Sequence, residues 1–132
     1  MENTMAKFGY DHLHFRSEDP HAAKEFWEKM FAAKVIQERE LGGAPSFNMD
    51  LNGMSFIVSG RAEGEDPKRT SSDPRYGLDH FGLSVDNMDE AQKDLSSKGA
   101  EWICEPWEIR PGVKIAFIKG PDNISIELAQ RD

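Results

Sequence analysis

The sequence predicts an α+β fold built from two βαβββ modules. Three observations predict this fold: an Asp-His pair opens each half of the chain, at 11–12 and again at 79–80, a helix-like segment follows each pair, and three short strand-like runs follow each helix. The modules occupy about 8–60 and 78–130, and a polar connector at 61–77 joins them. Two copies are too few for a solenoid, so we expect each module to bury its sheet against the other.

In the first module, the Asp-His pair opens a strand-like segment, and a helix follows. Asp19 suits the N-cap of this helix and Pro20 its first position. Helical spacing within 21–34 places five apolar side chains on one stripe: Ala23, Phe26, Trp27, Met30 and Phe31. Three strand-like runs come next, at 34–40, 46–52 and 53–60. The Asn52-Gly53 pair between the last two runs predicts a tight hairpin.

The second module has the same order of elements after its own Asp-His strand. A helix at 87–100 turns Met88, Ala91 and Leu95 inward, and Gly99 closes it. Strand-like runs follow at 100–107, 112–120 and 123–130. The sequence Pro121-Asp122-Asn123 marks a turn that corresponds to the hairpin of the first module. The connector has almost no large aliphatic residues, which favours a mobile loop or a lid.

Composition excludes several classes of function. The 132 residues suit a single domain, 1–132. No apolar run approaches the roughly 20 residues of a membrane span, and the N-terminus does not have the layout of a secretory signal. A net charge of −8 argues against nucleic-acid partners. Cys104 has no second cysteine with which to form an internal disulfide. We therefore expect a cytoplasmic protein with neither membrane nor nucleic-acid partners.

Candidate metal ligands stand at repeated positions. Alternation along a strand places His12 and His14 on one face. Glu127 lies in an otherwise apolar strand and needs a partner if its face is enclosed. Aligning the two halves places Ile57 opposite Glu127, so His12, His80 and Glu127 fill three of four symmetry-related positions. Two histidines and a carboxylate are typical of a divalent metal site with open positions, although a metal-free hydrogen-bonded trio is the structural alternative.

Three segments carry a family resemblance: DHLHFRSEDPHAAKEFWEKMF, LDHFGLSV and GPDNISIEL. Together with the doubled βαβββ plan, they resemble the vicinal oxygen chelate superfamily, which includes glyoxalase I, extradiol dioxygenases, fosfomycin-modifying enzymes and bleomycin-binding proteins. The resemblance extends from about Tyr10 to Leu128. In that family an aspartate caps the first helix at a fixed distance from the first metal histidine. The pair His12 and Asp19 has this spacing and His14 does not, so the resemblance selects His12 as the counterpart of His80.

The resemblance implies a curved eight-stranded sheet whose concave face holds one divalent ion, either Fe2+, Mn2+, Zn2+, Ni2+ or Co2+. It implies a lyase or isomerase that chelates vicinal oxygens of a small-molecule substrate and stabilises an enediolate. Small members of the family are often homodimers, sometimes with each site built from both chains. Glu127 and His14 are the candidate catalytic residues, with His14 either moving a proton or serving only as a hydrogen-bonded structural histidine.

Two alternatives remain open at the level of sequence. An iron(II)-dependent extradiol-type dioxygenase uses the same kind of His-His-Glu set. A metal-free protein of the bleomycin-resistance type would keep the concave face of the sheet and bind a drug or another small molecule there without metal. Ile57 stands where glyoxalase I normally has a carboxylate, which departs from the pattern of that enzyme.

Overall fold

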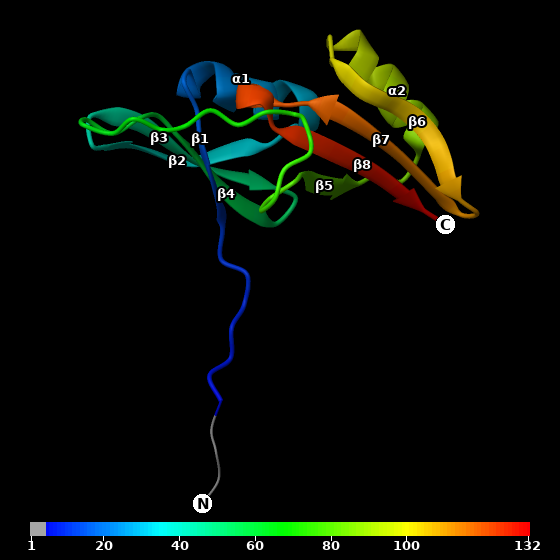
Figure 1. The fold of residues 1–132 in the computed structure, drawn as a ribbon, viewed down its shortest axis with the longest axis horizontal. Coiled ribbons are helices and arrows are strands. Elements are labelled where there is room, and N and C mark those ends of the chain that lie inside the picture. Colours follow the sequence, from blue (N-terminus) through cyan, green and yellow to red (C-terminus); the bar gives the residue numbers. More distant parts are fainter. Residues whose placement is uncertain (1–4) are drawn as a thin grey trace, which may run out of the picture.

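The computed structural model describes residues 5–132 and contains two modules whose α-helix and strands follow the same order (Figure 1). The first module consists of β1 (Leu13–Arg16), α1 (Pro20–Phe31), β2 (Lys34–Leu41), β3 (Ala44–Leu51) and β4 (Met54–Ser59). The second consists of β5 (Phe81–Ser84), α2 (Met88–Ser97), β6 (Trp102–Arg110), β7 (Val113–Lys119), a short 3-10 turn η1 (Pro121–Asn123) and β8 (Ser125–Arg131). The predicted α+β class with βαβββ modules is confirmed.

The eight strands form two sheets of four. Their orders are β1-β4-β3-β2 and β5-β8-β7-β6. In each module the first strand pairs in parallel with the last, and the other neighbours pair antiparallel. The strands of residues 5–132 therefore do not form one continuous hydrogen-bonded ladder, and side-chain packing joins the two sheets.

Local sequence signals set the ends of the helices and the hairpin. The Asp19 side chain accepts a hydrogen bond from the backbone N–H of Ala22 at 3.1 Å, as an N-cap does. Asn87 caps α2 in the same way through Glu90. Asn52 and Gly53 both have positive φ, 48° and 93°, as a two-residue type I′ hairpin requires. The predicted cap at Asp19 and the predicted hairpin at Asn52-Gly53 are confirmed, whereas the cap at Asn87 was not predicted.

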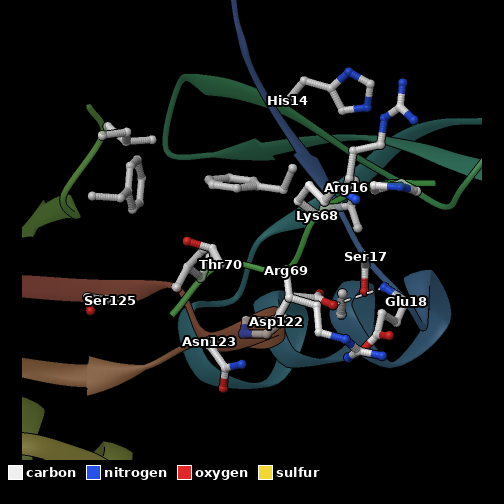
Figure 2. Close-up of a pocket in the computed structure, with 18 of the residues that line it drawn as sticks. His14, Arg16, Ser17, Glu18, Lys68, Arg69, Thr70, Asp122, Asn123 and Ser125 are labelled. Atoms are coloured by element: carbon white, nitrogen blue, oxygen red, sulfur yellow. Dashed lines mark hydrogen bonds and ion pairs between the residues drawn. The ribbon is translucent and has the colours of Figure 1, made fainter. Parts of the chain in front are cut away.

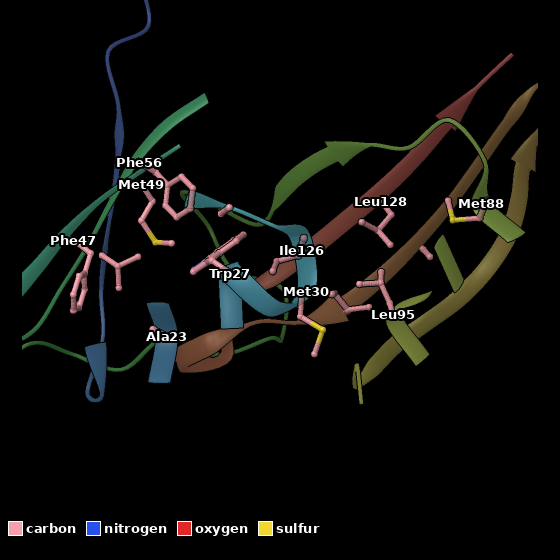
Figure 3. Packing of buried hydrophobic residues seen from close by; sticks show 14 residues of the cluster. Ala23, Trp27, Met30, Phe47, Met49, Phe56, Met88, Leu95, Ile126 and Leu128 are labelled. Carbon is pink, nitrogen blue, oxygen red and sulfur yellow. The ribbon is translucent and has the colours of Figure 1, made fainter. Parts of the chain in front are cut away.

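One apolar core spans both modules (Figure 3). Helix α1 packs on β3 and β4, and α2 packs on β8. In the predicted stripe of α1, Ala23, Trp27 and Met30 are buried, and the other two residues are partly buried. Across the junction, the Phe81 ring lies 5.9 Å from that of Trp27 and 6.0 Å from that of Phe15. Aromatic contacts of this kind fix the two modules against each other.

The connector between the modules is a loop that contacts both of them. Arg69 forms an ion pair with Glu18, just before α1. The Ser72 hydroxyl donates a hydrogen bond to the carbonyl of Asn123, at 3.0 Å. Figure 1 shows this segment running from β4 across to β5. No helix within residues 5–132 is long and apolar enough to cross a membrane.

Candidate metal and substrate site

His80 and Glu127 meet on one face of the second sheet. His80 directly precedes β5 and Glu127 lies on the neighbouring β8; His80 Nε2 is 3.5 Å from Glu127 Oε2. The side chains are 35% and 20% exposed, so both remain accessible to a ligand. The Phe117 ring on β7 stands edge-on to the imidazole at 5.2 Å. The structure therefore brings two of the three predicted ligands together.

Each candidate histidine is paired with the aspartate that precedes it. His80 Nδ1 lies 2.8 Å from Asp79 Oδ2, and His12 Nδ1 lies 2.5 Å from Asp11 Oδ2. The hydrogen bond from His80 lowers the pKa of Asp79 below its usual value. A carboxylate at Nδ1 favours the tautomer with its proton on Nδ1. The Nε2 lone pair of each ring is then available to a metal.

The strand register makes the two modules equivalent residue by residue. His14 pairs with Ile57 across β1 and β4, and Gly82 pairs with Glu127 across β5 and β8. His12 therefore corresponds to His80, in agreement with the spacing argument. A Cβ added at Gly82 would meet no atom within 4 Å, so there is open space beside Glu127. The first module carries an imidazole and an isoleucine at these two places.

His12 lies apart from the other two predicted ligands. It precedes β1, its side chain is 43% exposed, and its charged neighbour is Asp11. Within residues 5–132, no three His, Cys, Asp or Glu side chains come close enough to hold a metal. A single chain therefore does not assemble His12 with His80 and Glu127, and the three-ligand set stays a prediction.

His14 is hydrogen-bonded within the first module. Its Nε2 lies 2.6 Å from the hydroxyl of Ser59, which is buried. Burial, followed by the nearby charges of Arg16 and His12, lowers the pKa of His14 below 6.5. His14 is therefore neutral at pH 7 and able to accept a proton.

Nearby on β3, the Ser46 hydroxyl and the Asn48 carbonyl oxygen are buried with no hydrogen-bond partner among the described residues.

A cavity of about 690 Å³ lies between the modules, under the connector (Figure 2). His14 and His80 both line it, whereas most of its charged lining comes from the connector and β1. Its cationic residues are Arg16, Arg61, Lys68, Arg69 and Arg75. Arg75 has one buried guanidinium nitrogen, Nη2, without a hydrogen-bond partner among residues 5–132. The cavity therefore offers a small molecule an apolar floor and a lining of mixed charge, because four acidic residues also line it: Glu18, Asp66, Asp79 and Asp122.

Sequence reasoning did not identify several of these residues. The partner of His14, Ser59, lies on a different strand with no pattern to mark it. Arg75 stands in a connector without a motif. Asp11 and Asp79 did carry a signal, because the repeat contains Asp-His pairs rather than isolated histidines. The recurrence of an acid before each histidine could have indicated a shared role.

The doubled βαβββ arrangement is that of the vicinal oxygen chelate fold. The chain matches the Glyoxalase/Bleomycin resistance protein/Dioxygenase superfamily over residues 9–128, and it belongs to that superfamily.

Relatives and solved structures agree with this assignment. An uncharacterized Bacillus subtilis protein, YwkD, is 29% identical, and the match covers 91% of this chain and 94% of that protein. Lactoylglutathione lyase GLX1 of Arabidopsis thaliana is 26% identical over 91% of this chain, which spans only 43% of the plant protein. Among solved structures, a Frankia glyoxalase-family domain superposes with a TM-score of 0.78 at 20% identity and covers 96% of this chain and 100% of its own.

A fosfomycin resistance protein, FosX, from Listeria monocytogenes superposes with a TM-score of 0.77 at 14% identity. That likeness covers 96% of each chain. FosX has also been solved with Mn(II) and sulfate. These structural likenesses describe the fold, and they show that proteins of this fold include metal-binding members.

Proposed function

We propose that the protein is a metal-dependent enzyme of the glyoxalase type, a lyase or isomerase acting on a small molecule with adjacent oxygens. The observation that carries the proposal is the group Asp79, His80 and Glu127, in which an imidazole paired with Asp79 at Nδ1 faces a carboxylate beside open space. A divalent ion bound there would supply Lewis acidity to two neighbouring substrate oxygens.

The donor geometry fits such an ion. Protein nitrogen and oxygen ligands bind zinc-like ions at about 2.0–2.2 Å, so two donors on one ion lie roughly 3–3.5 Å apart. His80 Nε2 and Glu127 Oε2 are separated by 3.5 Å, at the upper end of that range. Mixed imidazole and carboxylate ligands suit Fe2+, Mn2+, Zn2+, Ni2+ and Co2+ alike.

The third ligand, His12, comes from a second copy of the chain in this proposal. His12 lies outside the reach of His80 and Glu127 within the described chain, yet its Nδ1 is paired with Asp11 as His80 is with Asp79. A two-fold dimer would bring the first module of one copy against the second module of the other, and would form two identical sites.

His14 carries the proton in this proposal. It is neutral at pH 7, and its ring is held by Ser59. The substrate approaches through the junction cavity, which His14 and His80 both line. Arg75 also lines this cavity, and its guanidinium suits a substrate that bears a carboxylate or phosphate.

Metal content and proton exchange test the proposal. After loading with each of the five candidate ions, the parent protein should retain one ion per site and Glu127→Gln should lose it. The control Glu105→Gln, an exposed glutamate on β6, should keep the ion. With dihydroxyacetone in D2O, the loaded parent should exchange the protons beside the carbonyl faster than His14→Gln does. A parent protein that binds none of the five ions would overturn the proposal.

A further inference from the structure

We propose that Asp11 and Asp79 are positioning residues, which orient the two histidines so that each Nε2 faces the metal. The inference deepens the proposed function, because it rests on the metal site proposed above. It assigns a role to the acidic half of the repeated Asp-His pair, rather than to a further ligand.

The ring of His80 is oriented from both of its nitrogens. Nδ1 lies 2.8 Å from Asp79 Oδ2, and Nε2 lies 3.5 Å from Glu127 Oε2. With the proton on Nδ1 donated to Asp79, the lone pair of Nε2 points toward the Glu127 carboxylate. Histidines that bind metals generally donate their other N–H to a carboxylate or carbonyl, which fixes the ring and raises the basicity of the ligating nitrogen.

The same contact occurs independently in the first module. Asp11 Oδ2 is 2.5 Å from His12 Nδ1, although the strands that follow the two Asp-His pairs, β1 and β5, belong to different sheets. Neighbouring residues within a strand point to opposite faces and would not pair in this way. Both Asp-His pairs stand just before their strands, since β1 begins at Leu13 and β5 at Phe81. The recurrence at symmetry-related positions points to a function common to both histidines.

The second module offers the better test. The Asp79 side chain is 55% exposed, whereas that of Asp11 is 91% exposed and more open to competing water. His80 is also confined by the Phe117 ring. His80 is the only side chain to which Asp79 is hydrogen-bonded or ion-paired within the described residues, and the backbone and the charge of Arg75 also act on its carboxylate.

The experiment measures Co2+ binding to the full-length protein after it has been stripped with a chelator. Affinity comes from competition with a coloured chelator, and the visible spectrum of Co2+ reports the ligand geometry. We expect Asp79→Ala to lose about 10- to 100-fold in affinity and to change the spectrum, as removal of such a carboxylate typically does. Asp79→Asn keeps an acceptor for Nδ1–H without the charge, so it should lose less than the alanine variant.

The matched control is Asp73→Ala, which removes an exposed aspartate from the connector. It should bind Co2+ with the affinity and the spectrum of the parent. Thermal unfolding of each variant shows whether it folds; Asp79→Asn serves alone if the alanine variant does not. Parental affinity and spectrum in every folded Asp79 variant would overturn the positioning role while leaving the metal site intact. A parent protein that binds no Co2+ would instead overturn the site itself.

Discussion

Single residues distinguish the two modules at positions that the strand register makes equivalent. Beside its paired histidine, the second module has Glu127 next to Gly82, and the first has Ile57 next to His14. The carboxylate and the open space lie in one module and the neutral imidazole in the other. Because the two modules supply different functional groups, they fit a site to which each module contributes its own side chains.

Restoring symmetry at Ile57 should strengthen metal binding. Ile57→Glu would place a carboxylate at the counterpart of Glu127, and this fourth donor, the second with a negative charge, should raise Co2+ affinity by about tenfold or more. Competition with a chelator measures the change. Ser55→Glu adds the same charge two residues earlier, at an exposed position on β4. Equal gains in the two variants would indicate a general charge effect and contradict the ligand position.

His14 should make folding stability depend on pH. Its pKa is lowered in the folded protein, first by burial and then by Arg16 and His12, so the unfolded chain binds a proton more readily. The free energy of unfolding should therefore fall as the pH drops below the unfolded value of about 6.5. Urea unfolding at pH 7.5 and pH 5.5 should show a smaller loss for His14→Gln than for the parent. An identical loss in both proteins would refute this assignment.

At the scale of elements, the two helices end in different ways. Helix α1 is capped at its C-terminal end by Ala32, whose φ is 56°, in the left-handed region. After α2 the left-handed residue is Gly99, with φ 84°. The left-handed conformation costs a residue with a Cβ roughly 1–2 kcal/mol, and glycine adopts it freely. Sequence reasoning predicted the glycine signal and had no signal for the alanine.

Opposite substitutions at these two positions should have opposite effects. Ala32 is exposed, so Ala32→Gly loses no packing and should stabilise the protein by about 0.5–1 kcal/mol. A Cβ at Gly99 would meet no atom within 4 Å, so Gly99→Ala should cost about 1 kcal/mol through backbone strain alone. Urea unfolding at neutral pH measures both. A stabilising Gly99→Ala would show that backbone strain does not control this helix end.

Much of the fold could be predicted because its signals are local. Asp19, the Asn52-Gly53 pair and the apolar stripe of α1 act through residues a few positions away, and each behaves in the structure as its pattern predicts. The division of the strands into two sheets had no such signal, because it depends on the long-range packing of Phe15 and Trp27 against Phe81.

The candidate site was predictable to a smaller extent. The repeat identified His80 and Glu127, which do come together. It did not identify Ser59 or Arg75, because their roles depend on tertiary contacts with His14 and with the cavity. The separation of His12 from the other two ligands could not be predicted either. The alternation of side chains along a strand shows which face of the strand a residue occupies, but it does not show how two sheets are placed relative to each other.

At the scale of the whole molecule, the two modules share one core, but His12 of the first module does not lie together with His80 and Glu127 of the second. The aromatic junction and the connector fix the modules within one chain, and in the proposed arrangement His12 joins the His80–Glu127 pair of a second chain. We therefore expect a dimer of the 14.9 kDa chain in solution, measured by sedimentation equilibrium. A protein that stays monomeric at micromolar concentrations would contradict a shared site.

The most direct test of a site shared between chains is metal binding by a mixed dimer. Chains with His12→Ala and chains with Glu127→Ala are co-expressed with different tags, and the mixed dimer is isolated by two affinity steps. In a shared arrangement one of its two sites keeps all three ligands, so about one ion per dimer should bind, whereas each variant alone binds none. A mixed dimer as devoid of metal as the single variants would contradict the account.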